Sequence, residues 1–320
     1  MIRITDRTLS CLDAVPPDVP SLSRFLEFLI EMDADAIELS EKMYRLLSPL
    51  PPYSSYVLQI GQASDTTKFP DIPRFVCRNA PAGSSDKIRT EILLNDIRES
   101  YTIARYAECA KLRICGLDDM LTGDYLRTFG HLKECFYGDI EFCPANGFHC
   151  AAALAAEWVL SGTGTDIVTS FGGVGGFAPT EELIIILRVQ RLRKAGKTYE
   201  FFPEMAELLR KITGQTVRPN KPVIGQRIFH VESGIHVDGI AKQPKCYEPF
   251  PPEVVGLTRK VVIGKHSGAQ SVLIKLEELG LTCDKTFIPV ILERVKQTSA
   301  EKNGALTNLE FIEIVRGCRS

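Results

Sequence analysis

Titratable side chains gather in one short segment of this chain. The segment Phe229–Gly239 holds two His, one Glu and one Asp within nine residues, together with Gly234 and Gly239. A histidine titrates near neutral pH and can act as a general base, and a neighbouring carboxylate can fix its tautomer. Glycine permits a tight backbone turn that would present the imidazoles to a ligand. The spacing alone leaves two interpretations open: a catalytic histidine, or a polar turn with a capping histidine.

Two further motifs follow this segment and narrow the interpretation. They are Tyr247–Gly256 (YEPFPPEVVG) and Val262–Gly268 (VIGKHSG). In order and separation, the three motifs match those of the homocitrate and isopropylmalate synthases, and the chain resembles that family. The forms GIHVDG and GKHSG are most similar to the homocitrate synthases of nitrogen fixation. The resemblance implies a transferase reaction in which acetyl-CoA condenses with a 2-oxo acid such as 2-oxoglutarate and the thioester is hydrolysed.

The resemblance also implies roles for individual residues. In the family, a His and a Tyr from the region after the barrel reach into the active site of the partner subunit, and they match His236 and Tyr247 here. His236 would carry a proton with the help of Tyr247, while Glu232, as a third catalytic residue, and Asp238 would orient His236. The substrate-binding residues implied in the same way are Glu38, Lys265, His266 and Ser267.

The motifs of the N-terminal half depart from the family at its metal site. The family's first strand ends in Asp-x-Thr-Leu-Arg-Asp-Gly, where this chain has Asp6–Leu12 (DRTLSCL). The family's Phe-His-x-His-Asn-Asp is replaced by Phe142–Gly147 (FCPANG), and its metal-binding Asn by the Thr at the end of Gly172–Thr180. Hard divalent cations prefer carboxylate, carbonyl and imidazole ligands. The substituted positions are Ser10, Cys11, Cys143, Ala145 and Thr180.

The motifs therefore predict a chain that binds no metal cofactor itself and contributes C-terminal groups to a metal-bearing barrel subunit of the same family. This is the arrangement of a split homocitrate synthase, in which this chain resembles the omega type and is inactive alone. Two alternatives stay open. One is a non-catalytic regulatory or ligand-sensing protein, and the other is an enzyme with a soft metal on Cys11 and Cys143. The glycines at Gly172–Gly176 lack the full setting of a dinucleotide-binding loop.

The elements that must position these residues follow from the hydrophobic pattern. Short apolar runs alternate with helical patterns, which favours a parallel α/β sheet, and eight runs favour a degenerate (β/α)8 TIM-like barrel over an open doubly wound sheet. Some connections, such as Gln62–Pro70 and Asn79–Ser85, are too short for a helix. Helical patterns include Asp96–Cys109 and Pro179–Ala195. The predicted strands are Ile2–Thr5, Ala36–Leu39, Tyr56–Ile60, Arg74–Cys77, Glu91–Leu94, Leu112–Cys115, Asp139–Phe142 and Asp166–Ser170.

Composition and length bound the remaining properties. The barrel is expected over residues 1–196, a helix and linker over 197–222, and a small, mostly helical subdomain over 223–320. The net charge of −2 predicts no general attraction to nucleic acid or membranes. Neither a signal peptide nor a membrane span is evident, which favours a cytoplasmic protein. The ten cysteines contain no Cys-x-x-Cys pair, and most are expected to be reduced and buried.

Overall fold

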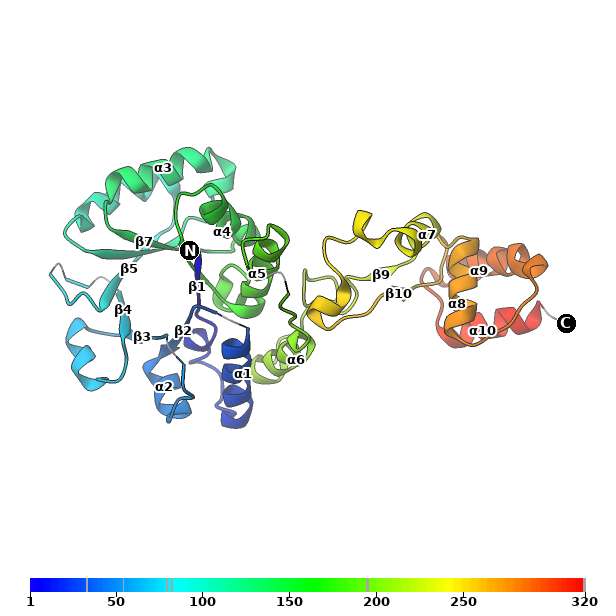
Figure 1. Ribbon diagram of the computed structural model, residues 1–320, viewed down its shortest axis with the longest axis horizontal. Coiled ribbons are helices and arrows are strands. Elements are labelled where there is room, and N and C mark those ends of the chain that lie inside the picture. Colours follow the sequence, from blue (N-terminus) through cyan, green and yellow to red (C-terminus); the bar gives the residue numbers. More distant parts are fainter. Residues whose placement is uncertain (33, 54, 79, 82, 194–195, 319–320) are drawn as a thin grey trace. The chain divides into compact units, whose positions relative to one another are not determined.

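Residues 1–195 form most of a closed barrel unit in the computed structural model of the chain (Figure 1). The structure describes residues 1–32, 34–53, 55–78, 80–81, 83–193 and 196–318. The strands are parallel, and β1 pairs with both β2 and β8, so that the sheet has no free edge. The barrel strands are β1 (Arg3–Asp6), β2 (Ala36–Ser40), β3 (Tyr56–Ile60), β4 (Arg74–Arg78), β5 (Ile88–Leu94), β6 (Lys111–Gly116), β7 (Asp139–Pro144) and β8 (Asp166–Thr169).

The closed sheet confirms the predicted barrel and excludes the open doubly wound sheet. Its outer ring is incomplete, as the short connections predicted. The described residues contain no α-helix between β3 and β6, where two 3-10 segments, Ala63–Lys68 and Ile97–Tyr106, take its place. The α-helices around the barrel are α1 (Val19–Glu31), α2 (Glu41–Leu47), α3 (Tyr125–Cys135), α4 (Ala151–Leu160) and α5 (Thr180–Val189).

Two predicted helices differ from the observed elements. The pattern at Asp96–Cys109 becomes 3-10 turns because it buries only Ser100 and Ile103, and so little packing is available to stabilise an α-helix. The helix predicted over Pro179–Ala195 ends at Val189. Arg191 then has a positive φ of 60°, which a continuing helix does not allow. The last residues of that prediction, 194–195, lie outside the described residues.

The chain divides into two compact units. The first contains residues 1–195 and 204–217, and the second contains 196–203 and 218–320. Helix α6 (Phe202–Thr213) belongs mostly to the first unit, where the Lys211 ammonium lies 2.9 Å from the Asp18 carboxylate at the start of α1. The second unit contains β9 (His230–Val231), β10 (Lys260–Val261), α7 (Gly234–Lys242), α8 (Ala269–Glu278), α9 (Ile288–Lys302) and α10 (Asn308–Gly317).

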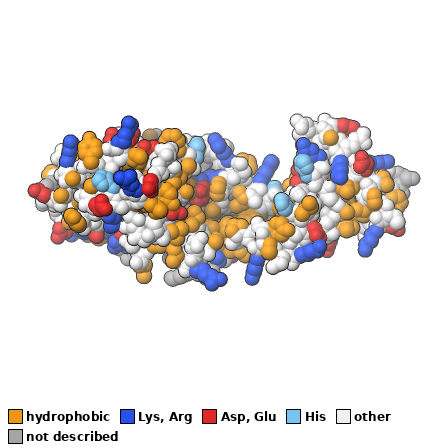
Figure 2. Space-filling model, turned by 90° about the horizontal axis from the view of Figure 1, so that it is seen from above, with side chains coloured by type: hydrophobic (Ala, Val, Ile, Leu, Met, Phe, Trp, Pro, Cys, Tyr) orange, Lys and Arg blue, Asp and Glu red, His pale blue; other side chains and the backbone are white. Residues whose placement is uncertain are grey.

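The second unit has a hydrophobic core of its own. Helices α8, α9 and α10 lie together in Figure 1, and each buries an apolar stripe against the others. A capping box between Thr307 and Glu310 fixes the start of α10. On the face of the molecule in Figure 2, Lys and Arg side chains are interspersed with Asp and Glu, in keeping with the small net charge. None of the described helices is long and apolar enough to cross a membrane.

The segment Phe229–Gly239 is a short strand followed by the start of α7, so the predicted tight turn is wrong. Its glycines serve close packing instead. A Cβ at Gly234 would lie 2.6 Å from the Cα of Gly268, and a Cβ at Gly239 would lie 2.2 Å from the Tyr247 ring. Both positions therefore need glycine because another chain segment occupies the space that a side chain would fill.

Candidate functional site

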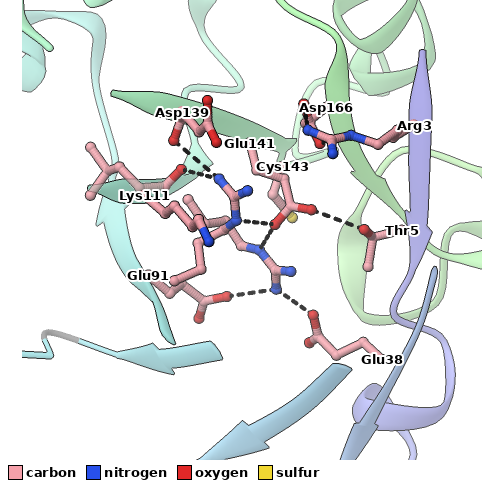
Figure 3. A network of polar contacts seen from close by, with 12 residues as sticks. Arg3, Thr5, Glu38, Glu91, Lys111, Asp139, Glu141, Cys143 and Asp166 are labelled. Carbon is pink, nitrogen blue, oxygen red and sulfur yellow. Dashed lines mark hydrogen bonds and ion pairs between the residues drawn. The ribbon is translucent and has the colours of Figure 1, made fainter. Parts of the chain in front are cut away.

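One group of side chains inside the barrel is charged, where branched aliphatic residues are usual. Arg113 on β6 is fully buried, and its Nε lies 2.7 Å from Oε2 of Glu141 on β7. Its Nη1 donates to Glu38 on β2 and lies 3.4 Å from Oε2 of Glu91 on β5. Figure 3 shows these three carboxylates converging on one guanidinium, with Thr5 donating to Glu141 from β1. The network therefore connects five of the eight strands, β1, β2, β5, β6 and β7.

Arg7, which directly follows β1, lies above this layer and is 5% exposed. Its Nη1 lies 3.3 Å from Sγ of Cys143 and 3.6 Å from Sγ of Cys115, and its guanidinium stacks 4.4 Å from the centre of the Phe177 ring. Its Nη2 lies 3.5 Å from Oε1 of Glu38. Arg7 therefore places a permanent positive charge inside the barrel beside the former metal-ligand position at Cys143.

The two arginines set the charge states around them. Burial would raise the pKa of Glu141, but Arg113 and Arg89 outweigh it and lower that pKa to about 2. Burial would also raise the pKa of Cys143, yet its hydrogen bond with Cys115 and the charge of Arg7 lower it. The arginines therefore favour the ionised form of Glu141 over its protonated form, and they shift Cys143 towards its thiolate form.

A second buried carboxyl group lies at the end of β1. Asp6 is fully buried, and burial raises its pKa to about 6, although Thr180 and Thr8 donate hydrogen bonds to its carboxylate. The Thr180 hydroxyl lies 2.5 Å from Oδ2 of Asp6 and 2.7 Å from the Thr169 hydroxyl. The side chain at the former asparagine position is therefore already engaged inside the protein.

The residues at the family's metal positions do not fit a divalent metal ion. Burial raises the pKa of Cys11 to about 12, so this thiol stays protonated, whereas metal ligands must be deprotonated. Cys143 has the Arg7 guanidinium as its neighbour, and a second cation there would be repelled. Ala145 offers no side-chain donor. No group of three or more His, Cys, Asp or Glu in the described part of the chain is arranged to hold a metal.

The glycine-rich segment after β8 packs onto the same region. Gly172, Gly173 and Gly175 have φ angles of 70 to 76°, in the left-handed region that favours glycine. A Cβ at Gly175 would also lie 2.8 Å from Sγ of Cys11. These glycines are accounted for by backbone conformation and by their contact with Cys11.

Glu38, predicted to bind substrate, lies in the charged layer and is fully buried. Its carboxylate accepts a hydrogen bond of 3.0 Å from the Ser10 hydroxyl and forms ion pairs with Arg7 and Arg113. A substrate would reach this carboxylate only by displacing one of those partners. Substrate binding by Glu38 remains a prediction.

The structure brings His236 and Tyr247 together at the surface of the second unit. Their ring centres are 5.8 Å apart with an interplanar angle of 66°, an edge-to-face contact. Both side chains are exposed, Tyr247 by 45%. Tyr247 reaches this position because Gly239, one turn along α7, has no side chain to exclude its ring. The predicted pair therefore presents an imidazole and a phenol to whatever covers this surface.

Glu232 and Asp238 have other partners than His236. A carboxylate oxygen of Glu232 accepts a hydrogen bond of 3.0 Å from the His266 backbone N–H, and Asp238 pairs with Lys242 at 2.6 Å. Glu232 thereby fixes the loop 264–268, whose His266 carbonyl accepts from the Gly234 N–H at the start of α7. The two carboxylates were expected to orient His236. In the structure Glu232 instead holds the loop 264–268, and Asp238 forms an ion pair with Lys242 on the surface of α7.

The loop 264–268 contains one buried side chain that stabilises the loop and two side chains that are exposed to solvent. Ser267 is buried, and its hydroxyl accepts a hydrogen bond of 3.0 Å from the Gly264 N–H, closing the loop. Lys265 and His266 are exposed. Since Gly234 of α7 contacts Gly268, this loop lies directly beside the helix that carries His236. Of the predicted substrate-binding residues, Lys265 and His266 have side chains available to a ligand.

Sequence reasoning missed Arg7 and Arg113. Arg7 occupies the variable position of Asp-x-Thr-Leu, and Arg113 lies two residues before Cys115, on the same face of β6. A charged residue inside an otherwise apolar predicted strand was the available signal, because isolated charges are not buried without partners.

Known proteins share both parts of this architecture. The barrel resembles hydroxymethylglutaryl-CoA lyase from Pseudomonas aeruginosa, with a TM-score of 0.54 and 10% identity over 68% of this chain and 94% of that chain, a likeness of fold. Residues 223–303 match the family model described as homocitrate synthase post-HMGL domain-like. The combination defines a TIM-like barrel followed by a post-barrel domain of the homocitrate synthase type.

Two curated relatives are homocitrate synthases or subunits of them. The chain is 29% identical over 317 residues to the homocitrate synthase omega subunit of Clostridium pasteurianum, covering 92% of this chain and 89% of that protein. It is 38% identical over 184 residues to homocitrate synthase AksA of Methanothermobacter thermautotrophicus, a match that spans 57% of this chain and 46% of that protein. The chain is therefore similar to homocitrate synthases, along most of its length to the omega subunit and over residues 223–303 to the post-barrel domain model.

Proposed function

We propose that this chain is one subunit of a homocitrate synthase-type acyltransferase and supplies His236 and Tyr247 to a partner subunit that bears the metal. The observation that carries the proposal is the contrast between the two units. In the barrel, Arg7 lies at 3.3 Å from Cys143, at the family's metal position, whereas the His236–Tyr247 pair is exposed. The similarity to a protein named as an omega subunit supports a partner subunit.

The proposed chemistry assigns one step to this chain. His236 takes a proton from the methyl group of acetyl-CoA, and the resulting carbanion adds to the carbonyl carbon of the 2-oxo acid. The alkoxide that forms takes up a proton, and water then hydrolyses the thioester to a carboxylate and the coenzyme A thiol. The partner's metal would polarise the oxo-acid carbonyl. Tyr247, whose ring edge contacts the imidazole, holds His236 in the orientation that proton transfer needs. Lys265 and His266 add positive or hydrogen-bonding groups beside the same surface.

The proposal is tested by reconstitution. This chain, a family barrel subunit with intact Asp-x-Thr-Leu-Arg-Asp and His-x-His motifs, and their mixture are assayed for thiol release from acetyl-CoA with 2-oxoglutarate. The mixture should be active and this chain alone inactive. His236→Ala should lower the mixed rate about 10²–10⁴-fold, the usual contribution of a general base. His131→Ala on α3 is the matched control and should keep the full rate.

Three results would separate this function from the alternatives. Full activity of the isolated chain would refute the accessory-subunit proposal. An unchanged rate for His236→Ala in a mixture that still associates, measured by analytical ultracentrifugation, would refute the catalytic role of His236. If that variant instead left every rate unchanged while the chain still bound 2-oxoglutarate or coenzyme A, the regulatory function would replace the catalytic one.

A further inference from the structure

A pocket of about 610 Å³ lies within the second unit, and neither His236 nor Tyr247 is among the residues that line it. One wall carries the basic side chains of Arg227, His230, Lys260 and Lys275. The residues that line the pocket in the described structure include no Asp or Glu. The pocket contains none of the predicted catalytic or substrate-binding residues, and its volume is within the range of small-molecule sites, about 300–1,000 Å³.

Local structure forces three of these bases together. In the parallel pairing of β9 and β10, Lys260 lies opposite His230, and the His230 N–H donates 3.0 Å to the Arg227 carbonyl oxygen in the preceding turn. A cation opposite a histidine on a neighbouring strand disfavours protonation of the imidazole. Burial, with Lys260 and Arg227, lowers the pKa of His230, as expected for a base crowded by cations.

The positive charge of this wall is only partly offset. Lys275 is 3% exposed and pairs with Glu278 at 3.0 Å. In the part of the chain that the structure describes, the side chains of Arg227 and Lys260 have no ion-pair or hydrogen-bond partner. The guanidinium group of Arg227 and the ammonium group of Lys260 are therefore available to bind an anion beside the His230 imidazole. A bound anion would reduce the repulsion between these two cations.

A second group of lining residues is apolar. It contains Ile263, Leu306 and Leu309, and the Leu306 N–H donates 2.8 Å to the Ile263 carbonyl oxygen, which fixes the segment before α10 to the segment after β10. Leu309 is 74% exposed although it is a large apolar residue. The neighbouring start of α10 is already capped by Thr307, whose hydroxyl accepts from the Glu310 N–H. The capped helix end leaves the basic wall as the place for a negative charge.

We propose that this pocket binds a nucleoside phosphate, with its phosphoryl group on Arg227 and Lys260 and its base against Leu306 and Leu309. Guanidinium and ammonium groups are the usual protein partners of phosphate. A free nucleotide and the phosphoadenosine part of coenzyme A share this chemistry. The inference stands independently of the proposed acyltransferase function, because it concerns binding by this chain alone.

The test is isothermal titration calorimetry of the full chain with ADP, coenzyme A, inorganic phosphate and adenosine. ADP or coenzyme A should bind more tightly than inorganic phosphate, and adenosine should be weakest. Lys260→Gln and Arg227→Gln should each weaken binding about tenfold, the loss of one charge-assisted contact. Lys296→Gln on α9 removes an equal charge outside the pocket and should change binding by less than about twofold.

A second variant separates the basic wall from the apolar lining residues. Leu309→Ser, at an exposed position, should weaken ADP binding and leave inorganic phosphate unaffected, with an unchanged thermal unfolding midpoint. The proposal is overturned if neither ADP nor coenzyme A binds. It is also overturned if Lys296→Gln weakens binding as much as Lys260→Gln, or if inorganic phosphate binds as tightly as ADP. Stronger binding of coenzyme A than of ADP would identify the coenzyme as the source of the nucleoside phosphate.

Discussion

Replacing Arg113 by Met should strongly destabilise the barrel. The methionine fills much of the same space but removes the charge that holds Glu141 at 2.7 Å and Glu91 at 3.4 Å and that also pairs with Glu38. All three carboxylates are at least nine-tenths buried, so they cannot regain water without opening the barrel. Breaking a buried ion pair from one side costs about 3–5 kcal/mol. We expect a loss of stability of that size.

A matched control exists on the same network. Arg78 also pairs with Glu91, at 3.4 Å, but its side chain is 66% exposed. Arg78→Met should therefore cost about 0–1 kcal/mol, as exposed ion pairs usually do. Urea unfolding of both variants, followed by circular dichroism, gives the two free energies of unfolding. Equal losses, or a loss below about 1 kcal/mol for Arg113→Met, would refute the buried network as a source of stability.

The pH dependence gives an independent check on the same charges. The pKa of Glu141 is about 2 in the folded chain, compared with the ordinary value of 4.5 that applies in the unfolded chain. Its ionised form therefore stabilises the folded chain fully above pH 4.5, and this contribution is lost as the pH falls towards 2. A shift of that size corresponds to about 3 kcal/mol. Without Arg113, a buried Glu141 prefers its protonated form. The difference in stability between the wild type and Arg113→Met should therefore shrink as the pH is lowered from 7 to 3.

Three other predictions concern separate parts of the chain. Gly239→Ala should displace the Tyr247 ring, which lies 2.2 Å from the new methyl position, and should therefore lower the rate of the reconstituted mixture. Gly130→Ala on α3 meets open space and should instead raise the free energy of unfolding by about 0.5–1 kcal/mol. Restoring the family ligands should not restore Mn²⁺ binding, measured by electron paramagnetic resonance, unless Arg7 is also changed to Ser. The restoring substitutions are Cys11→Asp, Cys143→His, Ala145→His and Thr180→Asn. Cys246, which is exposed, should react fastest with a thiol reagent in the native chain, and Cys246→Ser should remove that fast phase.

Much of the fold was predictable because each barrel strand is a short apolar run bounded by polar turns. The observed strands overlap all eight predicted segments, and Tyr56–Ile60 is predicted to the residue. The gap in the outer ring was predictable between β3 and β5, where the connections have little helical periodicity, but not between β5 and β6, where a helix was expected. The segment Phe229–Gly239 was misread because glycine favours turns in isolation, whereas here Gly234 and Gly239 make room for neighbouring segments.

The charged interior was harder to predict because its members come from strands far apart in the sequence. Thr5 and Glu141 are separated by 136 residues yet share a hydrogen bond of 2.9 Å. Their contact depends on barrel closure and on the stagger of the strands, which local patterns do not specify. The His236–Tyr247 pair was accessible from the sequence through the family resemblance, which implies that these two residues act together. Their spacing alone left the role of His236 open.

Arg7 supplies positive charge inside a barrel that is rich in buried glutamates. Buried carboxylates such as Glu38 and Glu91 need a cation as partner. Arg7 lies 3.5 Å from each of these carboxylates, so a side-chain cation now supplies charge at the barrel mouth. A guanidinium fixed by carboxylates cannot exchange with substrate as a metal's open coordination positions do. Under the proposed function, the barrel therefore serves as a scaffold, and the reactive groups of this chain must lie outside it, at His236 and Tyr247.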